Sequence, residues 1–166
     1  MKLDKRRRLE NKTDYGKRIK LLKAEVPRAV FRKTNKYIIA EYVTSKNAQD
    51  KIEIYTSSKE LLKMGWPKEF EGSLKSIPAS YLTGYLVAKK IIKAKGETPV
   101  VDFGMIRVLH KTKCFGFIKG LIDGGLKIKS EKEAFPEEER ILGKNLKEDF
   151  SKNFEKVKGE IDKHGK

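Results

Sequence analysis

Two β-rich runs meet in the stretch Arg28-Ala29-Val30-Phe31-Arg32-Lys33-Thr34-Asn35-Lys36-Tyr37-Ile38-Ile39-Ala40-Glu41-Tyr42-Val43. Each run is rich in the β-branched and aromatic residues that favour strands. The residues between the runs, Lys33-Thr34-Asn35-Lys36, supply turn chemistry, and asparagine tolerates the left-handed conformation that tight turns use. The stretch therefore predicts a β-hairpin over residues 28–43, with Pro27 just before its first strand.

The segments that follow predict a third strand and a short helix. Lys51-Ile52-Glu53-Ile54-Tyr55-Thr56 alternates with period two, as a half-buried strand does. Ser58 is placed to cap a short helix that runs through about Met64. Residues 65–75 then form a loop, in which Trp66 is expected to anchor on the core.

Further along the chain, two helices enclose one more strand. Residues 77–95 give the strongest helix signal, because Pro78 suits a first turn and Gly96 suits the end. Residues 99–104 predict a buried strand that ends in a turn, and residues 113–124 predict a second helix. This order implies at least one parallel crossover. The predicted fold class is α/β, a mixed sheet with flanking helices, in a globular domain of residues 27–130.

The N-terminal segment concentrates the positive charge. Residues 1–36 hold 14 Lys and Arg against 4 Asp and Glu, whereas the other 130 residues hold 25 against 19, and six of the eight arginines lie in the first segment. Arginine pairs with phosphate through two hydrogen bonds and stacks on bases. Residues 1–26 are therefore predicted to be a basic RNA-binding extension, in which Thr13 or Asp14 caps a short helix through Leu22.

The C-terminal segment has a different character. Residues 131–166 hold 9 Lys and Arg and 10 Asp and Glu, and their apolar residues predict one long helix that begins at Pro136. The apolar stripe comprises Leu142, Leu146, Phe150, Phe154, Val157 and Ile161. In this C-terminal helical extension the stripe either packs back on its own domain or docks on another protein or on RNA, and the sequence leaves both alternatives open.

The overall charge ranks the possible partners. A net charge of +16 favours nucleic acid over an anionic membrane or an acidic protein. The single cysteine, Cys114, forms no disulfide within the chain, which fits a reducing cytosol. No apolar run approaches the length that spans a bilayer, and no apolar stretch follows the basic start as in a secretory signal. No membrane partner is expected.

Signals of catalysis are weak. No phosphate-binding glycine loop is present, and His110 has no evident nucleophile partner. Asp102, at the end of a strand, could serve a nuclease-like site, but such a site needs several converging carboxylates, and Glu41 and Glu53 look like solvent-facing strand positions. We therefore expect no enzyme activity, no metal, no cofactor and no small-molecule substrate.

Three groups of residues instead combine charge, hydroxyl, amide and aromatic chemistry that suits RNA. The first is the N-terminal group, and it comprises Lys5, Arg6, Arg7, Arg8, Asn11, Lys12, Thr13, Tyr15, Lys17, Arg18 and Arg28. The second is the hairpin tip, and it comprises Arg32, Lys33, Thr34, Asn35, Lys36 and Tyr37. The third is the loop group, which follows the Asp102 strand and comprises Arg107, His110, Lys111 and Lys113. The alternative interpretation is that the tip is a plain polar turn. The tip is adjacent to the basic extension, which argues against that alternative.

Several motifs then resemble, in order, one family of ribosomal proteins. They are Arg6-Arg7-Arg8, Lys12-Thr13-Asp14-Tyr15 with Lys17-Arg18, Pro27-Arg28, Arg32-Lys33-Thr34-Asn35-Lys36-Tyr37-Ile38-Ile39-Ala40, Pro78-Ala79-Ser80-Tyr81-Leu82-Thr83-Gly84, Val101-Asp102-Phe103-Gly104, Lys119-Gly120-Leu121-Ile122-Asp123-Gly124-Gly125-Leu126 and Phe135-Pro136-Glu137-Glu138-Glu139-Arg140. Together they cover roughly residues 5–145. They resemble the 5S rRNA-binding proteins of the large ribosomal subunit, number eighteen in bacteria and archaea and number five in eukaryotes, in their archaeal form.

The resemblance implies a ribonuclease-H-like arrangement of strands without activity. It also implies that the chain binds 5S rRNA and touches large-subunit rRNA and the neighbouring 5S-binding and other central-protuberance ribosomal proteins, in the cytoplasmic ribosome. The chain departs from the family at Tyr37, where a histidine is usual, and at Lys111-Thr112-Lys113-Cys114, where Lys-Gly-Ser-Arg is usual. A free RNA chaperone would share the basic extension but not the ordered motifs.

Overall fold

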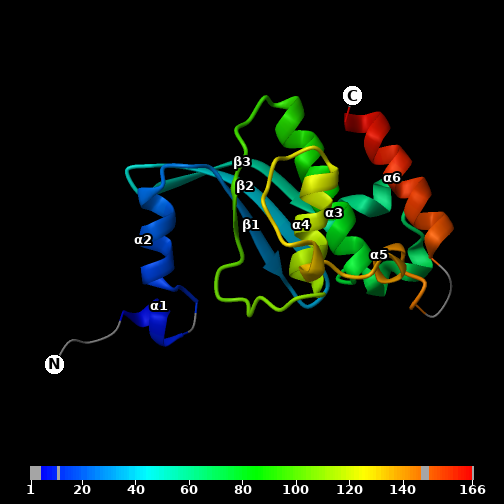
Figure 1. The fold of residues 1–166 in the computed structure, drawn as a ribbon, viewed down its shortest axis with the longest axis horizontal. Coiled ribbons are helices and arrows are strands. Elements are labelled where there is room, and N and C mark those ends of the chain that lie inside the picture. Colours follow the sequence, from blue (N-terminus) through cyan, green and yellow to red (C-terminus); the bar gives the residue numbers. More distant parts are fainter. Residues whose placement is uncertain (1–4, 11, 147–149, 166) are drawn as a thin grey trace.

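A computed structural model describes residues 5–10, 12–146 and 150–165 of the chain, and it contains one four-stranded sheet. The strands are β1 (Arg28–Lys33), β2 (Ile38–Lys46), β3 (Gln49–Ser57) and β4 (Val100–Asp102). Their order across the sheet is β3-β2-β1-β4, with β1, β2 and β3 antiparallel in turn and β4 parallel to β1. Figure 1 shows helices packed beside this mixed sheet, which confirms the predicted α/β class and the parallel crossover.

The predicted hairpin over residues 28–43 is confirmed. Lys33 of β1 faces Ile38 of β2, and the Thr34 amide donates to the Tyr37 carbonyl across the turn at 2.9 Å. A second hairpin joins β2 to β3 through Asn47 and Ala48, which both have positive φ angles, of 51° and 62°. The third strand is thus also confirmed, although it is longer than the period-two pattern indicates.

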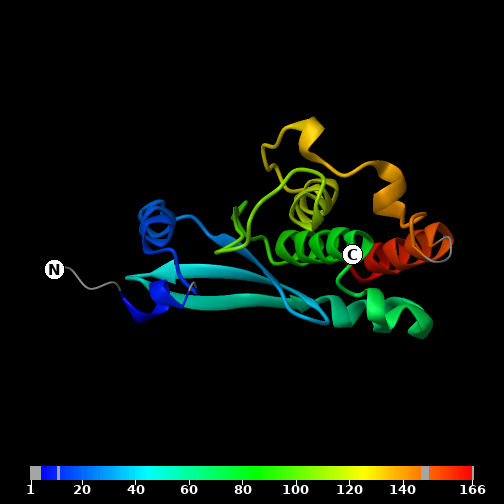
Figure 2. The ribbon, with the colours of Figure 1, turned by 90° about the horizontal axis from the view of Figure 1, so that it is seen from below.

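Two helices cover one face of the sheet (Figure 2). They are α3 (Ile77–Lys93), which Ser76 caps by accepting from the Ala79 amide, and α4 (Lys113–Asp123). Alternate side chains of β1 and β2, such as Phe31 and Ile38, pack under these helices in the main core. The opposite face of the sheet, which carries Val30, Arg32 and Glu41, is called here the open face.

The C-terminal segment packs on α3 instead of projecting away. The predicted single long helix is wrong, because Gly143 has a φ of 82° and ends α5 (Glu138–Leu142) before α6 (Ser151–Gly165) begins. The residues of the apolar stripe still pack together, because Phe150, Phe154, Val157 and Ile161 are buried in a second core with Trp66. The Tyr85 hydroxyl donates to the Asp162 carboxylate at 2.6 Å and ties α6 to α3. Of the two alternatives, the stripe packs on its own domain.

Two connecting segments differ from prediction in detail. Residues 58–64 form a 3-10 helix, η1 (Ser58–Met64), which Ser57 caps; Ser58 instead accepts the Ile38 amide of β2 at 3.0 Å. The predicted loop contains a second 3-10 helix, η2 (Lys68–Ser73), and Trp66 is buried as expected. A third, η3 (Lys132–Ala134), precedes α5.

The predicted buried strand over residues 99–104 is β4, which lies at the edge of the sheet, and its Val100 side chain is exposed rather than buried.

The basic extension forms two helices, α1 (Arg6–Leu9) and α2 (Tyr15–Lys23). Asp14 caps α2 by accepting the Lys17 amide at 3.1 Å, one of the two caps predicted from sequence. We call residues 5–10 and 12–23 the arm. Figures 1 and 2 show that the arm lies at one end of the molecule and α6 at the other, so the basic and the nearly neutral segments are far apart.

None of the helices in the described part of the chain has the length and apolar composition that crossing a bilayer requires. Within the same residues, His, Cys, Asp and Glu side chains form no cluster of three or more that could hold a metal ion.

Candidate nucleic-acid interface

Ion pairs fasten the arm to the sheet. Arg28 of β1 is only 4% exposed, and its guanidinium donates to Asp50 of β3 at 2.7 Å and lies 3.6 Å from Asp102 of β4. Asp50 also accepts from Arg18 of the arm at 3.0 Å, and Asp102 lies 3.8 Å from the Lys17 ammonium. These five side chains alternate in charge, and we call them the latch. The latch joins α2 to three strands.

The latch changes the interpretation of Arg28 and Asp102. Arg28 is one of the residues predicted to contact RNA, yet its buried guanidinium is already bonded to Asp50 and to the Ser45 hydroxyl. Asp102, the candidate nuclease carboxylate, also accepts the Gly104 amide at 2.9 Å. Both side chains thus hold the arm and the strand end in place.

The Asp50 carboxylate is stabilised in its charged form. Burial raises its pKa, but hydrogen bonds from Ser45, Arg18 and Arg28 outweigh this effect, so the pKa of Asp50 lies below its usual range. The Asp50 carboxylate of the latch is therefore charged at neutral pH.

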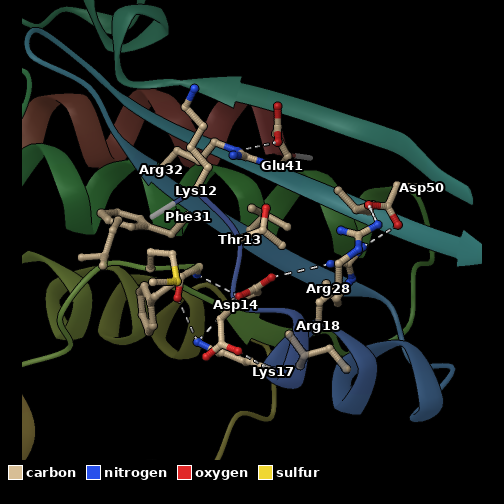
Figure 3. Close-up of a pocket in the computed structure, with 18 of the residues that line it drawn as sticks. Lys12, Thr13, Asp14, Lys17, Arg18, Arg28, Phe31, Arg32, Glu41 and Asp50 are labelled. Carbon is tan, nitrogen blue, oxygen red and sulfur yellow. Dashed lines mark hydrogen bonds and ion pairs between the residues drawn. The ribbon is translucent and has the colours of Figure 1, made fainter. Parts of the chain in front are cut away.

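A hollow of about 660 Å³ lies between the arm and the open face (Figure 3). Figure 3 shows the Arg28–Asp50 pair at one side of this hollow and the Arg32–Glu41 pair at another, with Thr13 and Asp14 between them. Seven cationic and four acidic side chains line the hollow, together with aliphatic residues such as Val30, Val43 and Ile52 of the sheet. The hollow thus combines an apolar floor with a basic rim.

Most cations of α1 are exposed. Glu10 pairs with Arg6 and with Lys12, each at 2.8 Å, and Arg7 donates to the Thr13 hydroxyl at 2.9 Å. The Lys5 ammonium lies over the Tyr15 ring, 4.6 Å from its centroid. Arg8 is exposed as well, whereas Asn11, another predicted contact, lies outside the described residues.

The hairpin tip presents part of its predicted set to solvent. Lys33, Asn35 and Lys36 are exposed, and so is Arg32, whose guanidinium pairs with Glu41 at 3.4 Å. The Thr34 hydroxyl is exposed but also bonds the Tyr37 carbonyl and amide, so it stabilises the turn. Tyr37 is half-buried and packs against the second core. The ring of Tyr37 therefore has a structural role as well.

The structure brings the tip and the loop group together. Burial lowers the pKa of Lys113 at the start of α4, and the positive charges of Lys33 and Lys75 lower it further. Lys75 is not among the predicted contacts, because it lies in a polar loop that carries no sequence signal of its own. Three lysines from distant parts of the sequence thus form one positive region.

The other residues of the loop group are spread along an exposed segment. Arg107 and His110 are exposed, and the His110 ring packs edge-on against Phe115 with centroids 5.2 Å apart. Lys111 has a positive φ of 57°, and its ammonium lies 3.6 Å from the Glu137 carboxylate. The same loop exposes Met105, Val108 and Leu109, which the sequence-based search for polar contacts did not include.

Known ribosomal proteins are similar to this chain in sequence. A family model described as ribosomal large subunit proteins 60S L5 and 50S L18 matches residues 1–99. The large ribosomal subunit protein uL18 of Korarchaeum cryptofilum is 41% identical over 141 residues, which is 85% of this chain and 70% of the relative. The uL18 protein of Methanoregula boonei is 38% identical over 164 residues, or 95% and 92% of the two chains. A third, from Methanothermobacter thermautotrophicus, is 36% identical over 89% of this chain and 74% of its own length.

These matches extend through the arm, the sheet and the helices, and they agree with the family that the ordered sequence motifs indicate. The chain belongs to the uL18 family of large-subunit ribosomal proteins.

Proposed function

We propose that this structural, non-enzymatic constituent of the large ribosomal subunit binds 5S rRNA and helps to attach it to large-subunit rRNA at the central protuberance. The observation that carries the proposal is the position of the arm. Its cations are presented at one end of the molecule, and α2 is held there by Lys17 and Arg18.

The arm and the tip suit a folded RNA because they present charge on a rigid support. Lys33 and Lys36 at the tip and Arg7 on α1 have no carboxylate within ion-pair distance among the described residues. Each such cation can neutralise a phosphate and release condensed counterions, which stabilises the complex. Sequence-tolerant contacts of this kind position a protein on RNA, while base contacts supply the specificity.

The third group supports a second RNA contact on the same molecule. The pKa of Lys113 is lowered by burial and also by the positive charges of Lys33 and Lys75, because like charges repel at short range. A phosphate placed among them removes that repulsion. The attachment of 5S rRNA to large-subunit rRNA needs two contact regions of this type. The arm and the lysine region are candidates for them, and Lys33 belongs both to the lysine region and to the hollow beside the arm.

A binding experiment tests the proposal. We expect the full chain to retain its cognate 5S rRNA in a filter-binding assay with Mg²⁺, and to leave it uncut, while transfer RNA at the same nucleotide concentration competes poorly. The chain should also copurify with large ribosomal subunits, which a free RNA chaperone would not do. Protein-dependent cleavage that is lost on Asp102→Asn, or equal retention of transfer RNA, would contradict the proposal.

A further inference from the structure

We infer that the hollow between the arm and the open face is a binding site for a single unpaired nucleotide of ribosomal RNA. In this arrangement the base lies on the aliphatic floor and the phosphate meets the basic rim. The inference rests on the proposed RNA-binding function and adds to it a defined pocket and a ligand class.

The floor of the hollow is apolar and part of it is exposed. Val30 of β1 and Val43 of β2 are buried, whereas Ile52 of β3, which is paired with Val43 across the strands, is 53% exposed. An isoleucine that is half exposed leaves apolar surface in contact with water in the free protein. The flat face of a base would cover it and remove apolar surface from water.

Among the described residues that line the hollow, the charged side chains without an ion-pair partner or a helix-capping role are cations. All four acidic side chains are already engaged, since Asp50 and Asp102 belong to the latch, Glu41 pairs with Arg32, and Asp14 caps α2. Of the cations, Arg7 is held by the Thr13 hydroxyl at 2.9 Å, which leaves its terminal nitrogens available. Lys33 has no carboxylate partner among the described residues. An anion is therefore the complementary group.

An apolar ring joined to an anion is the chemistry of a nucleotide. An apolar peptide segment would cover the floor but would bring no charge to Arg7 and Lys33, and a bare phosphate would leave Ile52 exposed. The volume of about 660 Å³ falls within the range of roughly 300–1,000 Å³ that small-ligand sites have, so it suits one nucleotide and not a helix. Bases within a helix are stacked and paired, so the nucleotide must be unpaired.

The first test uses two residues of β3 whose side chains are exposed to solvent to the same extent. Ile52 and Tyr55 are each 53% exposed, but only Ile52 lines the hollow. We expect Ile52→Asp to weaken binding of 5S rRNA by about tenfold to a hundredfold, the scale of one stacked base, and Tyr55→Asp to change it less than threefold. Thermal melts of both variants establish that the fold is retained. Equal losses from the two variants would assign the contact to the whole open face and overturn the inference.

The second test identifies the ligand and does not depend on a destabilising change. A photoreactive benzoylphenylalanine is placed at position 52 or at position 55, and the chain is irradiated with 5S rRNA alone and with 5S rRNA plus large-subunit rRNA. We expect position 52 to crosslink to one unpaired nucleotide, and primer extension shows which of the two RNAs carries it. Crosslinks to paired nucleotides, or to a ribosomal protein when whole subunits are irradiated, would overturn the inference.

The outcomes separate this inference from the proposed function. If wild-type protein fails to bind 5S rRNA while position 52 still crosslinks to an unpaired nucleotide of large-subunit rRNA, the 5S proposal fails and the nucleotide site stands. If wild-type protein binds 5S rRNA and position 52 yields no RNA crosslink, the nucleotide site is wrong and the 5S proposal stands.

Discussion

Arg28 on the first strand reaches across β2 and donates to Asp50 on the third strand at 2.7 Å, and Arg18 of the arm shares the same carboxylate at 3.0 Å. The Asp50 carboxylate thus connects a buried residue of the sheet with the arm that packs outside it. Because Arg28 is almost fully buried, its charge needs this partner. The orientation of the arm relative to the sheet therefore depends on Asp50.

Asp50→Asn should destabilise the protein and loosen the arm. The change leaves the buried Arg28 with Asp102 alone at 3.6 Å and frees Arg18. We expect a loss of about 1–3 kcal/mol in the free energy of unfolding, the cost of removing a charged partner from a buried group. Urea unfolding measures the loss, and faster amide exchange in α2 reports the loosened arm.

The matched control is Glu53→Gln on the same strand. Glu53 pairs with Lys51 at 3.0 Å on the surface, where solvent screens the pair, so its removal should change stability much less than Asp50→Asn does. Similar losses from the two variants would mean that the latch is no stronger than an ordinary surface pair.

Stability should fall in acid below the ordinary pKa of an aspartate. Although burial raises the pKa of Asp50 and of Asp162, hydrogen bonds from their partners lower both values overall. A group whose pKa is lower in the folded state stabilises the protein above its unfolded pKa, and this contribution is lost as pH falls through the folded value. These two groups should therefore stabilise the protein by a constant amount between pH 5 and 8, and the melting temperature should fall below about pH 4 as that contribution is lost.

The control for the acid transition is a pair of substitutions. Asp50→Asn and Asp162→Asn should each melt at a lower temperature at pH 7 and lose less than the wild type on acidification. If the wild type and both variants lose stability in parallel below pH 4, other carboxylates are responsible.

Substitution of two glycines compares a site of close helix–helix packing with an open site on a helix surface. A Cβ at Gly120 would lie 2.1 Å from the Tyr81 carbonyl oxygen of α3, whereas nothing lies within 4 Å of a Cβ at Gly159 of α6. Gly120→Ala should therefore force α3 and α4 apart and cost about 2 kcal/mol or more, and Gly159→Ala should gain roughly 0.5–1 kcal/mol from its helix propensity. Chemical denaturation of both variants provides the test, and a neutral Gly120→Ala would contradict the packing.

The C-terminal helix should contribute to stability and not only to solubility. Ile161 is completely buried against the second core, so Ile161→Ala should cost about 2–5 kcal/mol. Lys163 is exposed two residues further along the same helix, and replacing it by alanine should change the free energy of unfolding by less than about 0.5 kcal/mol. A small effect at Ile161 would mean that α6 is detached in solution.

The sequence predicted the strands and helices well because period-two and helical patterns and caps such as Asp14 are local signals. It failed where one residue interrupts a pattern, as Gly143 interrupts the apolar stripe by adopting a φ of 82°. The chemistry of the residue types in the sequence identifies the three groups proposed to bind RNA. The sequence does not show which of these residues lie close together in the fold. Lys75 joins Lys33 and Lys113 through the fold, and the buried position of Arg28 depends on Asp50, which lies 22 residues away.

The arm should supply the salt-dependent part of RNA affinity. Deleting residues 1–13 removes Lys2, Lys5, Arg6, Arg7, Arg8 and Lys12 but leaves Asp14, Lys17 and Arg18, so the α2 cap and the latch persist. Each phosphate contact contributes roughly 0.7–0.9 to the slope of log affinity against log salt. Since Arg6 and Lys12 already pair with Glu10, four cations remain, and we expect the slope for 5S rRNA to fall by about three to four units.

The melting temperature should change by no more than a few degrees, because none of the described side chains in residues 5–13 is buried. The control removes charge from the opposite end of the molecule by replacing the exposed Lys152 and Lys156 of α6 with glutamine. Titrations over a series of KCl concentrations should give this double variant the wild-type slope. A slope that falls with the α6 variant and stays constant with the deletion would place the RNA at the C-terminal end and reverse the assignment of the two ends.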